Sequence, residues 1–388
     1  MNAWNSRPWR RLLALSLVLA LAACQAPSPG NPPAAGGETP AVKTTNSGFA
    51  CPEPQPRLPV TSTALNLFVW TEYIPADILE CFGLVYGLQV NREEFSSNEE
   101  LYAKLEAGAA GYDIVHPSDY IINVMIRAGL LQPLDMSQLP NLANIDPEYL
   151  KLYGDRAAYI APYQVGSQAI IYDSERVPNP PQAWADLWRP EFARHMVFVD
   201  DSRIIIGMTL LSLGYSVNTT DAGQLAEAEA KLKELVPNVK LFDSDSPKTA
   251  LIAGDADLGI VWNGEAFLAQ REKPSLQYVF PREGAITFED GFGIPKSAPH
   301  VDAANAWINY VLQPDVAWLL LQDYPYTLPN RAALEFARIN HAELYQAYTD
   351  SPITNTPAAT LLAGARVEDV GAALTQYDRI WTEVKGGQ

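Results

Sequence analysis

Aromatic and acidic side chains recur in this sequence directly after short apolar runs that are typical of β-strands. The run at 65–69 is followed by Trp70, Thr71, Glu72 and Tyr73. Four later runs end in the same way, with Ser118 and Tyr120, with Asp200 and Asp201, with Trp262 and Glu265, and with Phe288, Glu289 and Asp290. One such cluster is ordinary packing at the edge of a core, whereas five clusters at equivalent places indicate a shared site.

Together these residue types are suited to binding a molecule with several ammonium groups. Aromatic faces pack on methylene groups and attract alkylammonium ions through their quadrupoles. Carboxylates pair with the ammonium groups and accept their hydrogen bonds. A linear polyamine, which has charged ends and methylenes between them, needs both features. The sequence therefore predicts a cleft for such a cation.

The elements that would position these residues alternate between strand-like and helical patterns. Strand-like runs lie at 65–70, 88–93, 112–117, 196–201, 238–245 and 257–262. Helical patterns lie near 77–82 and at 98–107, 119–129, 202–213, 221–235, 246–253 and 264–271. This alternation predicts an α/β fold with parallel sheets. Two further strand-like runs, 159–173 and 291–297, break the rhythm and are interpreted as crossings between two lobes, with the ligand in the interlobe cleft.

The N-terminal residues are expected to be processed. Arg7, Arg10 and Arg11 precede an apolar run at 12–23 that is too short for a membrane span. Small residues stand immediately before Cys24, which resembles a bacterial lipobox. That resemblance implies cleavage of residues 1–23 and a lipid on Cys24 that anchors the protein to a membrane. A plain secretory signal peptide is the alternative.

Residues 24–60 are expected to form a tether. From residue 25 the stretch holds nine Pro and four Gly, with few large apolar residues. The remaining residues suffice for two lobes, which we place at 61–168 with 293–325 and at 169–292 with 326–388.

Cys51 and Cys81 are the two other cysteines of the chain. In an exported protein they can form a disulfide that joins the end of the tether to the first helix of the domain. Two separate thiols are the alternative.

The charge balance excludes nucleic acid as a partner. Removal of three Arg with residues 1–23 leaves 24 of 27 basic residues against 45 acidic ones, a net charge near −21. Binding to phosphates requires the opposite sign. The acidity suits a cationic ligand, although it also simply keeps a protein in solution.

Motifs of enzymes and of cofactor or metal sites are missing from the sequence. We find no phosphate loop, no GxGxxG, no HExxH and no Cys–His arrangement that indicates catalysis. The stretch 243–247 resembles the start of a calcium loop, but Lys248 and Gly254 stand where a Gly and a bidentate acid are needed. Ser246 and Pro247 are better explained as an N-cap and the first residue of a helix. We therefore expect no catalysis, no cofactor and no metal.

The order and spacing of the motifs resemble the periplasmic polyamine-binding proteins of ABC importers. The resemblance runs from about residue 65 to the C-terminus. It rests on "WTEYIP", "SNEELYAKL", "YDIVHPSDY", "WADLWRPEF", "DDSR", "LGYSVNTTD", "SDSPKTALIAGDADLGIVWNGEAF", "GFGIP" and "LPN". It implies a two-lobe periplasmic-binding-protein fold, type II-like, that closes on its ligand. It also implies a monomer outside the cytoplasmic membrane that delivers spermidine or putrescine to an ABC permease.

The resemblance also implies roles for individual residues. The aromatic walls would be Trp70, Tyr73, Tyr120, Trp262, Phe288 and Tyr326, and the acids that hold ammonium groups would be Asp290 and Asp201. Smaller polar contributors would be Ser118 and Ser244, and Thr71 and Glu72 lie in the matching stretch.

Some positions depart from the family pattern. Ile204 and Val367 replace an acid and an amide of spermidine binders, while Glu265 and Phe288 resemble putrescine binders. The "WTEY" stretch resembles spermidine binders, and so does the chain as a whole, so we lean slightly to spermidine. Two other readings stay open: a binder of the same fold for thiamine, a metal or an opine, and a sensor subunit for a membrane receptor.

Overall fold

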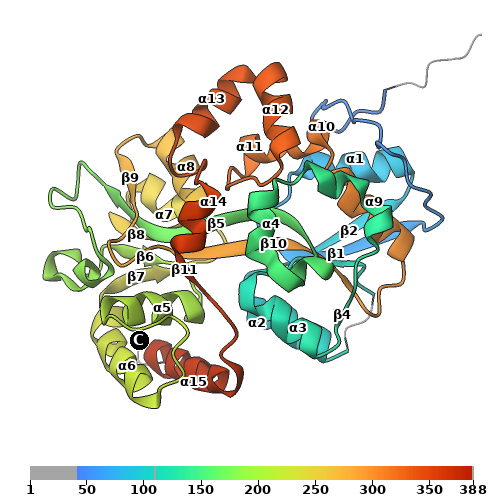
Figure 1. The fold of residues 1–388 in the computed structure, drawn as a ribbon. Coiled ribbons are helices and arrows are strands. Elements are labelled where there is room, and N and C mark those ends of the chain that lie inside the picture. The colour runs from blue at the N-terminus through green and yellow to red at the C-terminus, as the bar shows by residue number, and fades with distance from the viewer. Residues whose placement is uncertain (1–41, 109–110, 387–388) are drawn as a thin grey trace, which may run out of the picture. The chain divides into compact units, whose positions relative to one another are not determined.

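The computed structural model describes residues 42–108 and 111–386, which form one compact unit from Val42 onward (Figure 1). The expected signal peptide, residues 1–23, and Cys24 lie outside the described residues. Within the described ranges, no helix combines the length and the apolar character that are needed to cross a membrane.

Two sets of parallel strands form the core of the fold. The first set is β1 (Ala64–Trp70), β2 (Gln89–Phe95) and β3 (Ile114–Val115), and the second is β6 (Met196–Phe198), β7 (Val239–Phe242) and β8 (Leu258–Trp262). β1 pairs in parallel with β2 and β3, and β6 pairs in parallel with β7 and β8. The predicted α/β class with two parallel lobes is therefore confirmed.

Two long strands join the two sets into one sheet. β5 (Ile160–Asp173) and β10 (Ile286–Pro295) pair antiparallel with each other and run between the lobes in Figure 1. The strand order is β2-β1-β3-β10-β5-β8-β6-β7, with β4 (Leu131–Gln132) and β11 (Ala365–Arg366) paired to β10 and β9 (Leu276–Val279) paired to β5. β5 and β10 are the predicted crossings, and both are buried along almost their whole length.

Helices cover the sheet. They are α1 (Ala76–Tyr86), α2 (Asn98–Glu106), α3 (Asp119–Arg127), α4 (Pro147–Tyr153), α5 (Ser202–Ser212), α6 (Ala222–Leu235), α7 (Lys248–Ala253), α8 (Asn263–Glu272), α9 (Val301–Val311), α10 (Pro314–Ala317), α11 (Leu319–Asp323), α12 (Arg331–Asn340), α13 (Ala342–Asp350), α14 (Ala358–Ala363) and α15 (Leu374–Lys385). Polar N-caps fix several helix starts: the side chains of Ser97, Asp201 and Asp221 accept backbone N–H groups of α2, α5 and α6.

Two details differ from the sequence-based expectation. α7 begins at Lys248 with Pro247 as its N-cap, one residue later than expected, because the Ser246 hydroxyl contacts Thr249 and Lys248 instead of capping a backbone N–H. Helices α12 and α13 were expected in the second lobe. Their buried residues Ala333, Ala337 and Tyr348 pack in the same apolar cluster as Phe82 of α1.

The part of the expected tether at 42–60 is packed on the domain rather than free of it. Cys51 forms a disulfide with Cys81 of α1. The Gln55 N–H donates to Gln313 (2.6 Å), and the Arg57 guanidinium donates to the Val85 carbonyl (2.7 Å). These bonds, together with the packing of Phe49, Leu58 and Val60 on the apolar cluster of the domain, hold the segment in place. Residues 42–60 therefore belong to the domain and not to the expected tether.

Loss of the disulfide should destabilise the protein. Because the bridge closes a loop across a separation of 30 residues, its removal should lower the free energy of unfolding by about 3 kcal/mol. Urea unfolding with and without dithiothreitol measures the difference. The Cys51→Ala/Cys81→Ala variant is the control, because the reductant should not change its unfolding. Equal stability of the oxidised and reduced protein would contradict the prediction.

Candidate functional site

One cavity brings together all thirteen residues that the sequence nominated for ligand binding. The space between its side chains, with the adjoining open solvent included, is about 700 Å³, and it lies at the ends of strands from both parallel sets. The nominated residues that line it are Trp70, Thr71, Glu72, Tyr73, Ser118, Tyr120, Asp201, Ser244, Trp262, Glu265, Phe288, Asp290 and Tyr326. The departures Ile204 and Val367 line it as well.

The segment after β1 builds one wall of the cavity. Trp70 packs on Phe95 with ring centroids 4.6 Å apart, and its indole N–H donates to the Ser118 hydroxyl (3.1 Å). Glu72 follows with a left-handed backbone, φ 48°, and Asp119 at the start of α3 has φ 44°. Such backbone conformations cost energy in residues with a side chain and cluster at binding sites. Both strained residues line the cavity.

A group of edge-to-face aromatic rings forms a second wall. Tyr326 lies 5.0 Å from Tyr73 and 6.0 Å from Phe288, measured between ring centroids, with interplanar angles of 79° and 75°. Two glycines leave the space that these rings fill. A Cβ on Gly264 would stand 2.7 Å from the Tyr326 ring, and a Cβ on Gly166 would stand 2.5 Å from Phe288. The packing of this wall therefore requires glycine at both positions.

Asp290 presents a buried carboxylate to the cavity. It lies on β10 with 4% of its surface exposed, and its Oδ2 accepts a hydrogen bond from the Tyr73 hydroxyl (2.7 Å). Its Oδ1 is buried and has no hydrogen-bond partner among the described residues. Burial raises the pKa of Asp290 to about 7, although the Ser118 and Tyr73 hydroxyls favour the charged form. A cation that reached Oδ1 would relieve this unfavourable arrangement.

Asp201 is a second acid with a raised pKa. Its side chain caps α5 by accepting the Ile204 N–H (3.0 Å). Burial, with the nearby Glu99 carboxylate, raises the pKa of Asp201 to about 7. The guanidinium of Arg203 lies over the rings of Tyr120 and Tyr377 and donates to the Glu368 carbonyl rather than to Asp201.

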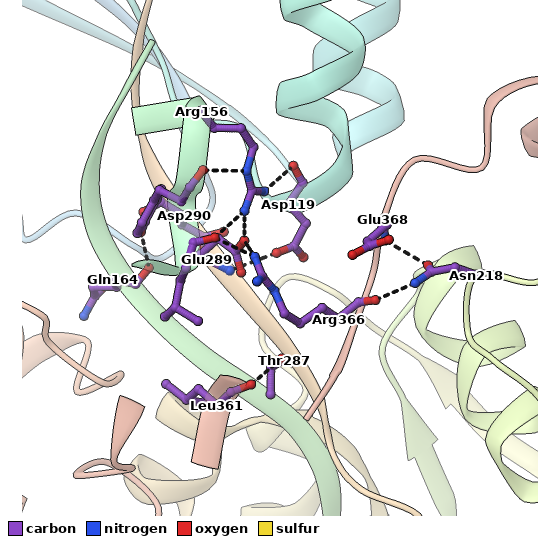
Figure 2. A network of polar contacts seen from close by, with 12 residues as sticks. Asp119, Arg156, Gln164, Asn218, Thr287, Glu289, Asp290, Leu361, Arg366 and Glu368 are labelled. Atoms are coloured by element: carbon purple, nitrogen blue, oxygen red, sulfur yellow. Dashed lines mark hydrogen bonds and ion pairs between the residues drawn. The ribbon is translucent and has the colours of Figure 1, made fainter. Parts of the chain in front are cut away.

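A network of charges behind the cavity holds the strand that carries Asp290 (Figure 2). The neighbouring Glu289 points away from the cavity and forms ion pairs with Arg156 and Arg366. Arg156 also donates to the Asp119 carbonyl (3.0 Å), and the Asp119 carboxylate accepts the Glu289 N–H (2.9 Å). Because successive side chains of a strand point to opposite faces, Glu289 lies against two arginines and Asp290 faces the cavity.

Glu72 and Glu265 share a cation that the sequence did not nominate. The Nζ of Lys248 lies 2.8 Å from an oxygen of Glu72 and 2.9 Å from an oxygen of Glu265. Ser244, at the same end of the fold, accepts the backbone N–H of Asp200 (2.8 Å). Thr71 donates its hydroxyl to the Phe95 carbonyl (3.3 Å).

Sequence reasoning missed Lys248 and several residues that line the cavity. Asp119 and Arg203 stand inside the stretches "HPSDY" and "DDSR", next to residues that were nominated, so their position was a usable signal. Lys248 was considered only as a residue that breaks a calcium loop. The other missed lining residues are Asn98, Gln168 and Asp245.

The fold and the cleft together define an extracytoplasmic solute-binding protein. Residues 80–352 match the family model of bacterial extracellular solute-binding proteins, and the chain belongs to this family.

Individual relatives give a narrower likeness than the family model does. The chain is 38% identical over 327 residues to a spermidine/putrescine-binding periplasmic protein of Salmonella typhimurium, which covers 84% of this chain and 92% of that protein. Among solved structures, it is 32% identical to a spermidine/putrescine ABC transporter substrate-binding protein of Streptococcus pneumoniae, with a TM-score of 0.68 and coverage of 84% and 99%. It is 30% identical to a lipoprotein of Treponema pallidum, with a TM-score of 0.70 and coverage of 83% and 99%.

The buried carboxylate of Asp290 should make the empty protein less stable as the pH rises. Its pKa is raised from 3.8 to about 7, so between these values the folded state keeps a proton that the unfolded chain has lost. Its contribution to stability is full at low pH and is lost as the pH rises through 7. Asp290→Asn removes this dependence of stability on pH. The free energy of unfolding of the variant, relative to that of the wild type, should therefore rise by about 3 kcal/mol from pH 5 to pH 8.

Urea unfolding of both proteins at the two pH values, after ligand has been removed by dialysis through denaturant, measures this gain. A stability difference between variant and wild type that does not change with pH would contradict the prediction.

Proposed function

We propose that this chain is the polyamine-binding component of an ABC importer and that it binds spermidine or putrescine in the cavity described above. The observation that carries the proposal is the unpartnered Oδ1 of Asp290, buried in a cavity with aromatic walls. A buried carboxylate oxygen without a partner is costly, and an ammonium group is the ligand that removes the cost. The names of the relatives support the same ligand class.

A polyamine would use both kinds of side chain that line the cavity. One ammonium group would bind Asp290, with the Tyr73 hydroxyl beside it, and another would bind Asp201. The methylenes between them would lie against the rings of Trp70, Trp262 and Phe288, where apolar area is removed from water without loss of a hydrogen bond. Neither feature suffices alone, because the rings provide no charge and the acids no apolar surface.

The protein would act outside the cytoplasmic membrane. Ligand between the two lobes would favour their closure, and the closed form would deliver it to the permease as a monomer. A lipid on Cys24 would keep the protein at the membrane. The likeness to a lipoprotein of Treponema pallidum is consistent with this anchor.

Polyamines should stabilise the protein, and Asp290→Asn should abolish most of that effect. A ligand at 100 times its Kd adds about 2.7 kcal/mol to the free energy of unfolding. This should raise the melting temperature of the wild type at pH 8 by several degrees. The variant should bind at least about 30-fold more weakly, because one ammonium loses its charged partner.

Thermal unfolding of ligand-free protein with spermidine, putrescine, spermine or thiamine measures both effects. Thiamine is the control cation. No shift with any polyamine would contradict the proposed function, and an equal shift in the variant would remove Asp290 from the site.

Replacement of Cys24 should release the protein from the membrane. Acyl chains provide anchoring through buried methylene groups, so the Cys24→Ser variant should move to the soluble extracytoplasmic fraction. Immunoblots of membrane and soluble fractions from a bacterial host measure the distribution, with Ser28→Ala as a nearby control that should stay at the membrane. A Cys24→Ser variant that remains in the membrane fraction would contradict lipid anchoring at this residue.

A further inference from the structure

Lys248 is an ammonium group that the protein itself places against two acids of the cavity wall, Glu72 and Glu265. Its Nζ lies 2.8 Å from Glu72 Oε2, 2.9 Å and 3.0 Å from the two carboxylate oxygens of Glu265, and 2.9 Å from the Ser246 hydroxyl. An ammonium has three N–H donors. All of them are therefore used by oxygens of the protein.

The two carboxylates around Lys248 belong to the cavity wall, and they come from different strand sets. Glu72 follows β1, and Glu265 lies in the first turn of α8. The Lys248 side chain is 16% exposed and the Glu265 side chain 5% exposed. Burial would lower the pKa of Lys248, but Glu265 and Glu72 outweigh it and the pKa is raised. The lysine is therefore charged at neutral pH.

The other acids that face the cavity have no such partner. Asp290 has its Tyr73 hydrogen bond and an unpartnered Oδ1, and Asp201 accepts backbone N–H groups at the start of α5. Neither forms an ion pair among the described residues, which lie at 42–108 and 111–386. Asp119 is already hydrogen bonded to the Glu289 N–H, and Asp245 is exposed to solvent. Two buried carboxylates, those of Asp290 and Asp201, are thus left for ammonium groups of a ligand.

We propose that Lys248 acts as a tethered ammonium that fills one amine position of the cavity, so that the site selects a diamine over a triamine. The inference rests on the proposed polyamine-binding function and makes its ligand more specific. A diamine would place its charges on Asp290 and Asp201. The third ammonium of a triamine would lose its water of hydration. It would gain no carboxylate in return, because Glu265 is already paired with the ammonium group of Lys248.

This role explains why Glu265 cannot be interpreted by itself. As an isolated acid it would add a binding position for an amine. Both of its carboxylate oxygens bond to Lys248, which it shares with the half-exposed Glu72, so Glu265 no longer offers that position. Lys248 is therefore the residue that should decide how many ammonium groups the ligand carries.

The first measurement uses the wild-type protein, freed of ligand, in titration calorimetry with putrescine and spermidine. The proposal expects the lower Kd for putrescine. A spermidine Kd equal to or below that of putrescine would overturn the inference while leaving the proposed function intact. Failure to bind either amine would overturn the proposed function and the inference with it.

The second measurement compares Lys248→Met with wild type. Without the lysine, Glu265 is free for a third ammonium, so the ratio of the spermidine Kd to the putrescine Kd should fall at least tenfold. A smaller shift, or an equal weakening of both amines as expected for a lysine that only ties the lobes together, would overturn the inference. Lys296→Met, at an exposed lysine, is the matched control and should keep the wild-type ratio.

A double variant tests whether the improved spermidine binding of Lys248→Met comes from Glu265. It also serves as a second test if the single variant is too unstable to measure. Lys248→Met/Glu265→Gln removes both charges together, so that no unpaired carboxylate is left at position 265. Its ratio should return towards the wild-type value, since the acceptor for a third ammonium is gone. A double variant that favours spermidine as strongly as Lys248→Met would overturn the assignment to Glu265.

Discussion

The unpaired carboxylate of Asp290 is the constraint on which the rest of the site depends. It lies on a buried strand that crosses between the lobes, so the backbone that carries it cannot move towards water. The adjacent Glu289 is fixed by Arg156 and Arg366. The strand therefore carries one acid with ion-pair partners, Glu289, and one without, Asp290. The unfavourable burial of Asp290 is present before any ligand binds, and a cation that binds there relieves it.

The acids of the cavity differ in what the protein provides for them. Asp290 and Asp201 receive hydroxyl or backbone donors, and burial raises the pKa of each to about 7. Glu265 receives a full cation from Lys248. The carboxylates of Asp290 and Asp201 thus remain able to bind an ammonium group of a ligand, whereas that of Glu265 does not. The difference follows from the partners of the acids and not from their number.

Sequence patterns predicted the fold and the nominated lining residues because both follow from local rules. The strand ends at Trp70 and Trp262 lie beside the same cleft whenever parallel strands are joined by helices. The packing of residues 42–60 was missed, since composition reports on the core that a segment can form alone and not on a disulfide and hydrogen bonds to distant residues. Helices α12 and α13 were misplaced for a similar reason, because amphipathic patterns do not say which partner a helix covers.

The missed role of Lys248 shows a further limit. The residue is separated from Glu265 by 17 positions and from Glu72 by 176 positions, and only the folded chain brings the three together. A motif comparison scores Glu265 only as an acid that resembles putrescine binders and does not say how it acts. The structure shows that this acid is paired with Lys248 inside the protein. Specificity in such a cleft is a difference between affinities, so a residue that never touches the ligand can set it by occupying the partner that a competitor would need.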